Sequence, residues 1–251
     1  MNDRSHIRQQ IWDALRQVAR PDTRFHFNFA EFIADFEGSD RATARLTALD
    51  WYQQARVVFV TPDNCLELLR AQTIRDGKVL LMTTYGICRG FLVLERTDVP
   101  SGLEDWAVLL DVIERVGRYV SLAEIQAHYP VDLLVTGGSA VNLQGARFGK
   151  GHGFFDIEWA CLYSLGVVEV TTPIIDVVHD CQVVDEELPI SPFDTICDAI
   201  ITPTRTIQVS NPQKPTGGIH WERLAPGMME SISILKEMKA LEAAGKLRTN
   251  R

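Results

Sequence analysis

The sequence predicts an α/β fold with three layers, in which helices cover both faces of a mostly parallel, Rossmann-like sheet. Short apolar runs rich in Val, Ile and Leu alternate along the chain with segments whose apolar residues recur at helical spacing. This order is typical of parallel α/β proteins. The chain has 251 residues, of which 46% are hydrophobic. That length and that apolar share suffice for one large domain, or for one domain with appendages.

The N-terminal part is expected to be helical with one irregular interruption. Residues 5–19 place apolar side chains such as Ile7 and Ile11 at helical spacing, which predicts a helix. Residues 21–38 are rich in Phe and show no regular pattern. A second helix is expected over residues 40–54.

The alternation of strands and helices then begins. Strands are expected over residues 56–60, 78–82, 132–136, 167–170, 173–178 and 198–202. Helices are expected over residues 64–75 and 156–164. Ligands of open parallel sheets bind beyond the carboxyl ends of the strands. The polar residues and glycines that follow these strands are therefore candidates for a site: Thr61, Asp63, Gly137, Gly138, His179, Asp180, Thr202 and Thr204.

The C-terminal part changes character. Residues 211–218 contain two prolines and two glycines, which predicts a loop or tether. Residues 224–244 carry apolar side chains at helical spacing and predict an amphipathic helix. We therefore expect an α/β domain over residues 1–210, and a tether and helix over residues 211–251 that pack on the same domain. A helix that binds a partner protein is the alternative interpretation of this face.

Composition narrows the classes of partner and location. The formal net charge of -8 disfavours non-specific binding to nucleic acid or to acidic membranes. The polar N-terminus does not read as a secretory signal, and no apolar run reaches the length of a membrane span. Five cysteines without a CxxC pair fit a reducing compartment. A cytoplasmic protein that binds a small molecule is expected; its oligomeric state stays open.

One run of alternating glycines is the most informative stretch of the chain. Gly149, Gly151 and Gly153 alternate with other residues just before the helix predicted from Asp156. Glycine lets backbone N–H groups approach an anion closely, and the following helix directs its N-terminus at the same anion. This is a phosphate-binding arrangement, although no Gly-Lys-Ser/Thr of the Walker type follows. By spacing alone, a tight turn between a strand and a helix explains the run equally well.

The same run carries a resemblance to a known family. Arg147-x-Gly149-x-Gly151-x-Gly153-Phe-Phe-Asp156 resembles the Arg-x-Gly-x-Gly-x-Gly-Tyr-Tyr-Asp signature of the 5-formyltetrahydrofolate cyclo-ligase family, also called methenyltetrahydrofolate synthetases. Further blocks match that family in the same order, at residues 4–8, 132–135 and 198–203. Other blocks are similar to a divergent branch that includes the methenyltetrahydrofolate synthetase domain-containing proteins: Gly149-Lys150-Gly151 and residues 179–185, 202–205 and 214–217. The resemblance implies a cyclo-ligase fold of the NagB, RpiA and CoA-transferase type.

The resemblance also implies a reaction and a set of site residues. In the family, ATP phosphorylates the formyl oxygen on N5 of the folate, the N10 amine closes the ring, and methenyltetrahydrofolate, ADP and phosphate result. Arg147 and Lys150 are expected to balance phosphate charge, and Asp156 is expected to hold Mg²⁺ directly or through water. The residues expected to bind the nucleotide are Arg4, Arg8, Gly149, Gly151, His152, Gly153 and Phe154.

Simpler interpretations stand beside these roles. Arg4 and Arg8 share one helix face, which is most often a solvated face. Asp156 alone could be a helix N-cap. His152 departs from the small residue that is common in the family, and it touches phosphate or points to solvent. The two phenylalanines that replace the family's tyrosines lack two hydroxyl groups and could simply pack in the core.

The folate side of the resemblance is altered. The family carries a Gly-Glu-Val-Asp-like turn after its first core strand, and the glutamate contacts the pterin. This chain has Thr-Pro-Asp63-Asn-Cys at that place, so Asp63 is the expected substitute. His179 and Asp180, at a strand end, are counted with the substrate residues because they are expected to line the nucleotide or metal pocket. A nucleophilic pair of His179 and Cys181 is the alternative, but no acyl-binding feature accompanies it.

Three functions remain open at this point. The first is an enzyme dependent on ATP and Mg²⁺ that acts on 5-formyltetrahydrofolate. The second is an ATP-dependent enzyme of the same fold with another small substrate, such as a thiamin-related compound, as the divergent branch suggests. The third is a nucleotide- or folate-binding protein without catalysis. We favour the first, because the match to the family is the only positive sign of a substrate.

Overall fold

A computed structural model describes residues 4–248, with side chains from residue 6 onward. Its main sheet has eight strands in the order β11-β10-β8-β5-β1-β2-β3-β4. The five central strands, β10 to β2 in that order, are parallel, while β11, β3 and β4 pair antiparallel at the two edges. The strands are β1 (Val57–Val60), β2 (Val79–Thr83), β3 (Phe91–Leu94), β4 (Arg118–Val120), β5 (Leu133–Gly137), β8 (Ile174–Val177), β10 (Ala199–Ile201) and β11 (Thr206–Gln208).

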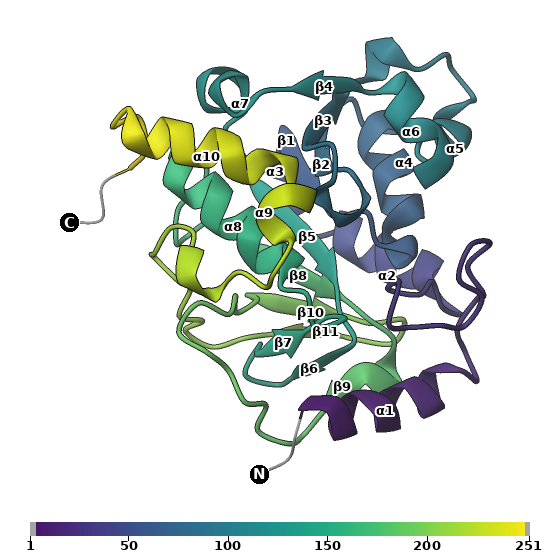
Figure 1. Ribbon diagram of the computed structural model, residues 1–251. Coiled ribbons are helices and arrows are strands. Elements are labelled where there is room, and N and C mark those ends of the chain that lie inside the picture. The colour runs from purple at the N-terminus through teal and green to yellow at the C-terminus, as the bar shows by residue number, and fades with distance from the viewer. Residues whose placement is uncertain (1–3, 249–251) are drawn as a thin grey trace.

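Helices cover both faces of this sheet (Figure 1), as the sequence predicts. Alternate residues of a strand point to opposite faces, and Val58 lies in one core cluster while Phe59 lies in the other. This explains why the central strands are uninterrupted apolar runs. The helices are α1 (Arg4–Leu15), α2 (Ser39–Thr47), α3 (Asp50–Gln54), α4 (Glu67–Arg75), α5 (Glu104–Ala107), α6 (Leu110–Val116), α7 (Leu122–His128), α8 (Phe154–Leu165), α9 (Met228–Ser231) and α10 (Ser233–Ala243).

A second, smaller sheet carries the start of the glycine run. It has the order β7-β6-β9, formed by β6 (Ala140–Asn142), β7 (Arg147–Phe148) and β9 (Val183–Val184). The chain leaves β5, passes through the hairpin β6–β7, and enters α8 through the glycine loop. The loop therefore lies between a strand and a helix, where the sequence places it.

Three predictions of local structure are wrong, two in the N-terminal 170 residues and one in the C-terminal part. Residues 167–170 do not form a strand but belong to the connection from α8 to β8. Val167 and Val168 are apolar because they pack in the core, and Val131 N donates to Val167 O outside any sheet. The single helix predicted over residues 40–54 is two helices, α2 and α3, since Leu49 has an extended backbone between them.

The C-terminal part returns to the domain. Residues 211–218 have no regular structure, as predicted. The single helix predicted over residues 224–244 is two helices, α9 and α10, since Ile232 has an extended backbone between them. Leu235 and Met238 of α10 are buried in the same apolar cluster as Leu162 of α8. Figure 1 shows α10 lying beside α8. None of the helices within residues 4–248 is long and apolar enough to cross a membrane.

Candidate functional site

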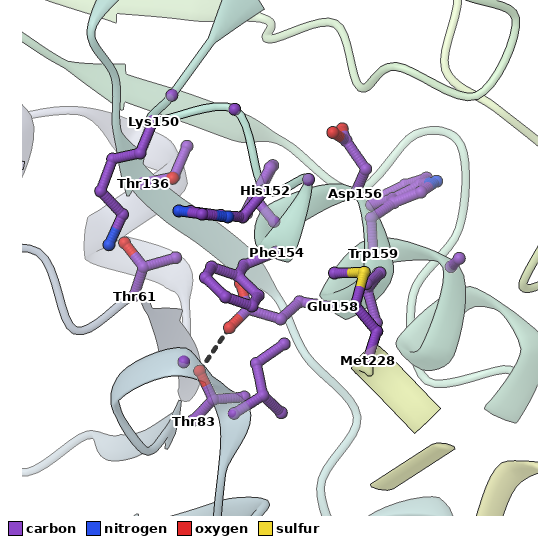
Figure 2. Close-up of a pocket in the computed structure, with 18 of the residues that line it drawn as sticks. Thr61, Thr83, Thr136, Lys150, His152, Phe154, Asp156, Glu158, Trp159 and Met228 are labelled. Atoms are coloured by element: carbon purple, nitrogen blue, oxygen red, sulfur yellow. Dashed lines mark hydrogen bonds between the residues drawn. The ribbon is translucent and has the colours of Figure 1, made fainter. Parts of the chain in front are cut away.

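A cavity of about 630 Å³ lies at the carboxyl ends of three parallel strands. Thr61 follows β1, Thr83 ends β2 and Thr136 lies at the end of β5, and all three line it. The glycine loop and the first turns of α8 form a second wall, and the C-terminal part of the chain forms a third. Figure 2 shows side chains from these walls converging on one space. The volume falls within the range of about 300–1,000 Å³ that is usual for ligand pockets.

The glycine loop and the start of α8 form an anion-binding geometry. Gly151 and Gly153 have φ angles of +110° and +69°, which residues with a Cβ rarely adopt. Gly153 precedes α8, a helix of 12 residues whose N-terminus has no side-chain cap. Its first N–H groups and its dipole are therefore available to an anion. The structure favours the phosphate cradle over the plain turn.

Arg8 reaches this loop from α1. Its Nε donates to Gly149 O at 3.2 Å, and its guanidinium lies against Gly151. The structure thus brings together two segments that are far apart in sequence, as expected for nucleotide-binding residues. The side chain of Arg4, predicted to share this role, lies outside the described residues.

Lys150 lines the cavity and reaches from the loop to the irregular N-terminal segment. Its Nζ donates to Glu31 O at 2.9 Å and lies 4.7 Å from the centre of the Tyr85 ring. Burial lowers the pKa of Lys150, and the nearby carboxylates of Asp63 and Glu31 oppose this shift. A partly desolvated ammonium group beside the loop is suited to phosphate, since water competes less for it.

Asp156 has one carboxylate oxygen engaged and one without a described partner. Its Oδ1 accepts from Thr195 N at 2.8 Å and from Thr195 Oγ1 at 2.6 Å. Burial raises the pKa of Asp156, while Arg147 and the hydrogen bonds from Thr195 oppose that shift. Within residues 4–248 there is no group of three or more His, Cys, Asp or Glu that could hold a metal alone. A single carboxylate next to an anion site still fits Mg²⁺, which binds one or two carboxylates together with phosphate oxygens and water.

Arg147 is buried and turned mainly toward protein. Its Nη2 donates to Gly137 O at 2.9 Å, and its Nε lies 3.7 Å from Asp176 Oδ2. Asp176 is fully buried, and burial raises its pKa to about 7 against the influence of Arg147. The Nε of Arg147 and both carboxylate oxygens of Asp176 have no hydrogen-bond partner among the described residues. Arg147 lines the cavity but also ties the loop to the end of β5, so its role at the phosphate stays a prediction.

Glu158 is a site residue that the sequence reasoning missed. It lies one helical turn after Phe154 on α8, lines the cavity and is only 2% exposed. Its Oε1 accepts a hydrogen bond from Thr83 Oγ1, the dashed line of Figure 2. Burial raises its pKa to about 8, although the hydrogen bond from Thr83 opposes the shift. The signal in the sequence was an acidic residue on the buried face of an otherwise apolar helix.

The segment predicted as a tether forms part of the cavity wall. Residues 217–220 and 223–228 line the cavity together with Pro215 and Ser231. Trp159 Nε1 donates to Pro215 O at 2.9 Å, and Lys214 Nζ lies 2.6 Å from Asp198 Oδ2. These contacts fix the segment against α8 and the end of the sheet, so the cavity depends on residues beyond the α/β core.

The predicted substrate residues have different surroundings. Asp63 lines the cavity, but its Oδ2 accepts from Thr61 Oγ1 at 2.5 Å and from Gly137 N at 2.9 Å. His152 lines it too, exposed, with its ring 5.2 Å from that of Phe154. These two positions agree with contact to a ligand, and Asp63 also links the ends of β1 and β5.

His179 and Asp180 are not among the residues that line this cavity. The Nδ1 of His179 accepts from Cys181 N at 3.2 Å and caps the short helix η4 (Asp180–Gln182). Asp180 Oδ1 accepts from the hydroxyls of Thr202, at 2.7 Å, and Thr204, at 2.6 Å. The structure therefore does not bring these two residues together with the loop, and their role at the substrate remains a prediction that this placement does not support.

Comparisons with known proteins agree with this geometry. The 5-formyltetrahydrofolate cyclo-ligase family matches residues 1–203. The chain is 35% identical over 243 residues to a methenyltetrahydrofolate synthase domain-containing protein of Homo sapiens, and 34% identical over 246 residues to one of Danio rerio. Each match covers 96% of this chain but only 62% and 63% of the relative, so the chain spans less than two thirds of their length.

A solved structure shows the same fold. The NMR structure of 5,10-methenyltetrahydrofolate synthetase from Aquifex aeolicus superposes with a TM-score of 0.51 at 16% identity, over 87% of this chain and 98% of that one. The prediction of a mixed α/β fold with a large, mostly parallel sheet is confirmed. With the match over residues 1–203, the chain belongs to the 5-formyltetrahydrofolate cyclo-ligase family.

Proposed function

We propose that this protein is an ATP- and Mg²⁺-dependent cyclo-ligase that converts 5-formyltetrahydrofolate to 5,10-methenyltetrahydrofolate, with release of ADP and phosphate. The observation that carries the proposal is the convergence of three features on one cavity. The first is the N-terminus of α8, which follows the glycine loop and has no side-chain cap. The second is the basic groups of Arg8 and Lys150. The third is the carboxylate of Asp156, of which only one oxygen accepts hydrogen bonds from the described residues. Membership of the family supplies the reaction type.

The residues of this chain would act chiefly by placing charge. Backbone N–H groups of the loop and of the first turn of α8 would hold the phosphates of ATP. Lys150 would neutralise charge as the γ-phosphoryl group moves to the formyl oxygen, and Asp156 would hold Mg²⁺. When bound, Mg²⁺ would screen the phosphate oxygens during transfer. The N10 amine then closes the ring, phosphate leaves, and the N10 proton passes to solvent or to a base.

The remainder of the cavity would take the folate. This part of the cavity is lined by Phe154 of α8 and by Ile87 and Met228, whose apolar side chains suit the face of a flat ring. The C-terminal segment would close this side and exclude water from the reacting groups. We further propose that residues 211–251 belong functionally to the same unit as residues 1–210, because they complete the cavity.

One assay tests the proposal. Protein, ATP, Mg²⁺ and 5-formyltetrahydrofolate are mixed, and the absorbance of methenyltetrahydrofolate is followed together with phosphate release. Product that requires both ATP and Mg²⁺ is expected. Phosphate release that is unaffected by the folate, with no methenyl product, would remove 5-formyltetrahydrofolate as the substrate.

A matched pair of lysine variants ties the activity to the cavity. Lys150→Ala is expected to lower kcat/KM for ATP by about 10-fold or more, because a cation at the phosphates is lost. Lys236→Ala is the control, since this exposed lysine on α10 does not line the cavity. Equal kinetics of the two variants would remove Lys150 from the phosphate site.

A second function is favoured by one specific observation. Asp63, the expected substitute for the pterin-binding glutamate, is one methylene shorter, and its Oδ2 is held by Gly137 N and Thr61 Oγ1 at the strand ends. This favours an ATP-dependent enzyme of the same fold that acts on another small molecule, such as a thiamin-related compound. ATP turnover with a thiamin precursor and not with the folate would support it, and ATP binding without turnover on any of these compounds would indicate a binding protein.

A further inference from the structure

One buried carboxyl group in the cavity lacks a structural explanation. Glu158 lies on α8 among apolar neighbours and is 2% exposed. Burying a carboxyl group is unfavourable unless charges or hydrogen bonds satisfy it. Among the described residues, no Lys or Arg nitrogen lies within ion-pair distance of Glu158, and its sole hydrogen bond is the one from Thr83 Oγ1. Stability of the fold alone does not account for an acid at this position.

The second oxygen of this carboxyl group faces the cavity. The hydrogen bond from Thr83, at the end of β2, occupies Oε1. Oε2 accepts no hydrogen bond from the described residues, and it is not among the fully enclosed polar atoms that lack a partner. Because Glu158 lines the cavity, this oxygen is available to a bound molecule. Thr83 fixes the orientation of the carboxyl group while leaving that oxygen free.

An aromatic ring lines the cavity from the same helix as Glu158. Phe154 precedes Glu158 by four residues on the same helix, so the two side chains share one face. Both side chains line the cavity, and Figure 2 shows them in the same part of it. Ile87 and Met228 also line the cavity and add apolar surface. An aromatic face next to a hydrogen-bonding edge is suited to a flat ring that is apolar above and below and carries N–H groups along its rim.

We propose that Glu158 is the specificity-determining residue of the substrate side of this cavity, and that it accepts hydrogen bonds from adjacent N–H groups of a planar nitrogen heterocycle lying against Phe154. The ligand class is a heterocycle with a ring N–H beside an exocyclic amine. Two such donors stabilise the ionised form of the group, which accepts them in parallel and releases its proton to solvent when the ring binds. The inference rests on the proposed function, since it assigns the second substrate of the same site. It also gives the site a carboxyl group on α8 that can bind the ring. Asp63 is less suited to this role, because its Oδ2 accepts a hydrogen bond from Gly137 N.

The test measures ring binding separately from turnover. Equilibrium Kd values are measured for pterin, which carries the 2-amino group, and for lumazine, which has an oxo group there. Wild-type protein is expected to prefer pterin. Glu158→Gln retains the size and the contact with Thr83 but cannot accept two donors. Its Kd for pterin should rise about 10- to 100-fold, the range for a hydrogen bond to a charged group. Its Kd for lumazine should not rise, because the amide can accept from the ring N–H and donate to the oxo group, and its Kd for ATP should stay within about twofold.

Further variants keep the outcome clear. Glu158→Asp retains a carboxyl group one methylene farther away and should keep a reduced preference for pterin. Glu187→Gln, an exposed acid, is the control and should match wild type. An unchanged pterin Kd in Glu158→Gln overturns the inference, and so does wild-type protein that does not discriminate the two rings. Loss of ATP and pterin binding together in both Glu158 variants would assign Glu158 a structural role and also overturn it.

The same measurements separate this inference from the proposed function. Wild-type protein that binds pterin through Glu158 but forms no methenyltetrahydrofolate would refute the cyclo-ligase activity and leave the recognition role standing. Wild-type activity with unaltered ring selectivity in Glu158→Gln would refute the recognition role and leave the activity standing.

Discussion

Two regions near the carboxyl ends of the parallel strands are both candidate sites in the sequence, and they differ in structure. The region around the glycine loop holds Glu158, Lys150 and Asp156 around a cavity, and part of their hydrogen-bonding capacity is unused. In the region after β8, Asp180 is bonded to two threonine hydroxyls and His179 caps a short helix. The first region has polar atoms without partners among the described residues, which a ligand can pair with. In the second region the polar groups form hydrogen bonds that stabilise a turn.

The comparison teaches that a strand-end position alone does not identify a site. Asp156 lies in the first turn of α8 and Asp180 begins the short helix η4, and both acids accept two hydrogen bonds from threonine residues. They differ in what surrounds them, since Asp156 borders an anion-binding loop and Asp180 does not. A substitution in each region can therefore break or sharpen the distinction.

The largest expected effect is at Asp156. Asp156→Asn keeps an oxygen for the hydrogen bonds from Thr195 but removes the negative charge that would hold Mg²⁺. We expect kcat to fall about 100-fold or more, because a lost metal contact removes several kcal/mol of charge stabilisation in phosphoryl transfer. Steady-state kinetics over a range of Mg²⁺ concentrations measure it, with the exposed Asp185→Asn as the control. A kcat within twofold of wild type at all Mg²⁺ concentrations would exclude Asp156 as the metal ligand.

The second largest effect is expected on stability, at Asp176, which lies beside Arg147. Its pKa is raised to about 7 by burial, so between about pH 4 and pH 7 the folded protein retains a proton that the unfolded chain has lost. The free energy of unfolding should therefore decrease as pH rises through this window, by an amount of the order of a few kcal/mol. Asp176→Asn, which carries no titrating proton, should flatten this slope and be more stable than wild type near pH 7.

Denaturant titrations of both proteins at several pH values measure the effect. They also test whether the unpartnered oxygens of Asp176 lie in a protonated group or form an ion pair with Arg147, 3.7 Å away. If Asp176→Asn proves less stable than wild type at pH 7, the ion pair prevails and the carboxyl group is ionised. In that case Asp176 balances the charge of Arg147, and Arg147 is less able to bind a phosphate.

Much of the fold followed from local pattern, and the parts that did not depend on partners distant in sequence. The central strands β1, β2, β5, β8 and β10 are buried on both faces, so each is an apolar run that needs no partner to be recognised. The edge strands β3, β4 and β11 are defined by antiparallel pairing and were not predicted. Residues 167–170 have the composition of a strand, but they serve as a buried connection.

The site divides in the same way. The spacing of Gly149, Gly151 and Gly153 predicted the loop, because the requirement for positive φ at Gly151 and Gly153 is local. The contact of Arg8 with the loop was expected only through the family resemblance. Glu158 was missed because its significance arises from burial and from Thr83, which is 75 positions away in the chain. The cavity wall formed by residues after Lys214 is likewise a tertiary feature.

The smallest expected effect is at Asp180, and it completes the comparison. Asp180→Ala removes the acceptor for the hydroxyls of Thr202 and Thr204, and the free energy of unfolding should fall by about 1–2 kcal/mol. Although burial opposes ionisation, those hydrogen bonds lower the pKa of Asp180, so the loss should be greatest above its usual titration range. Denaturant titration and steady-state kinetics are measured on the same sample, and kcat and KM should stay within about twofold of wild type. A tenfold change in KM for ATP or for the folate, with stability unchanged, would mean that this turn contacts a substrate. Asp180 would then return to the site, and the presence of internal partners would no longer distinguish a structural acid from a functional one.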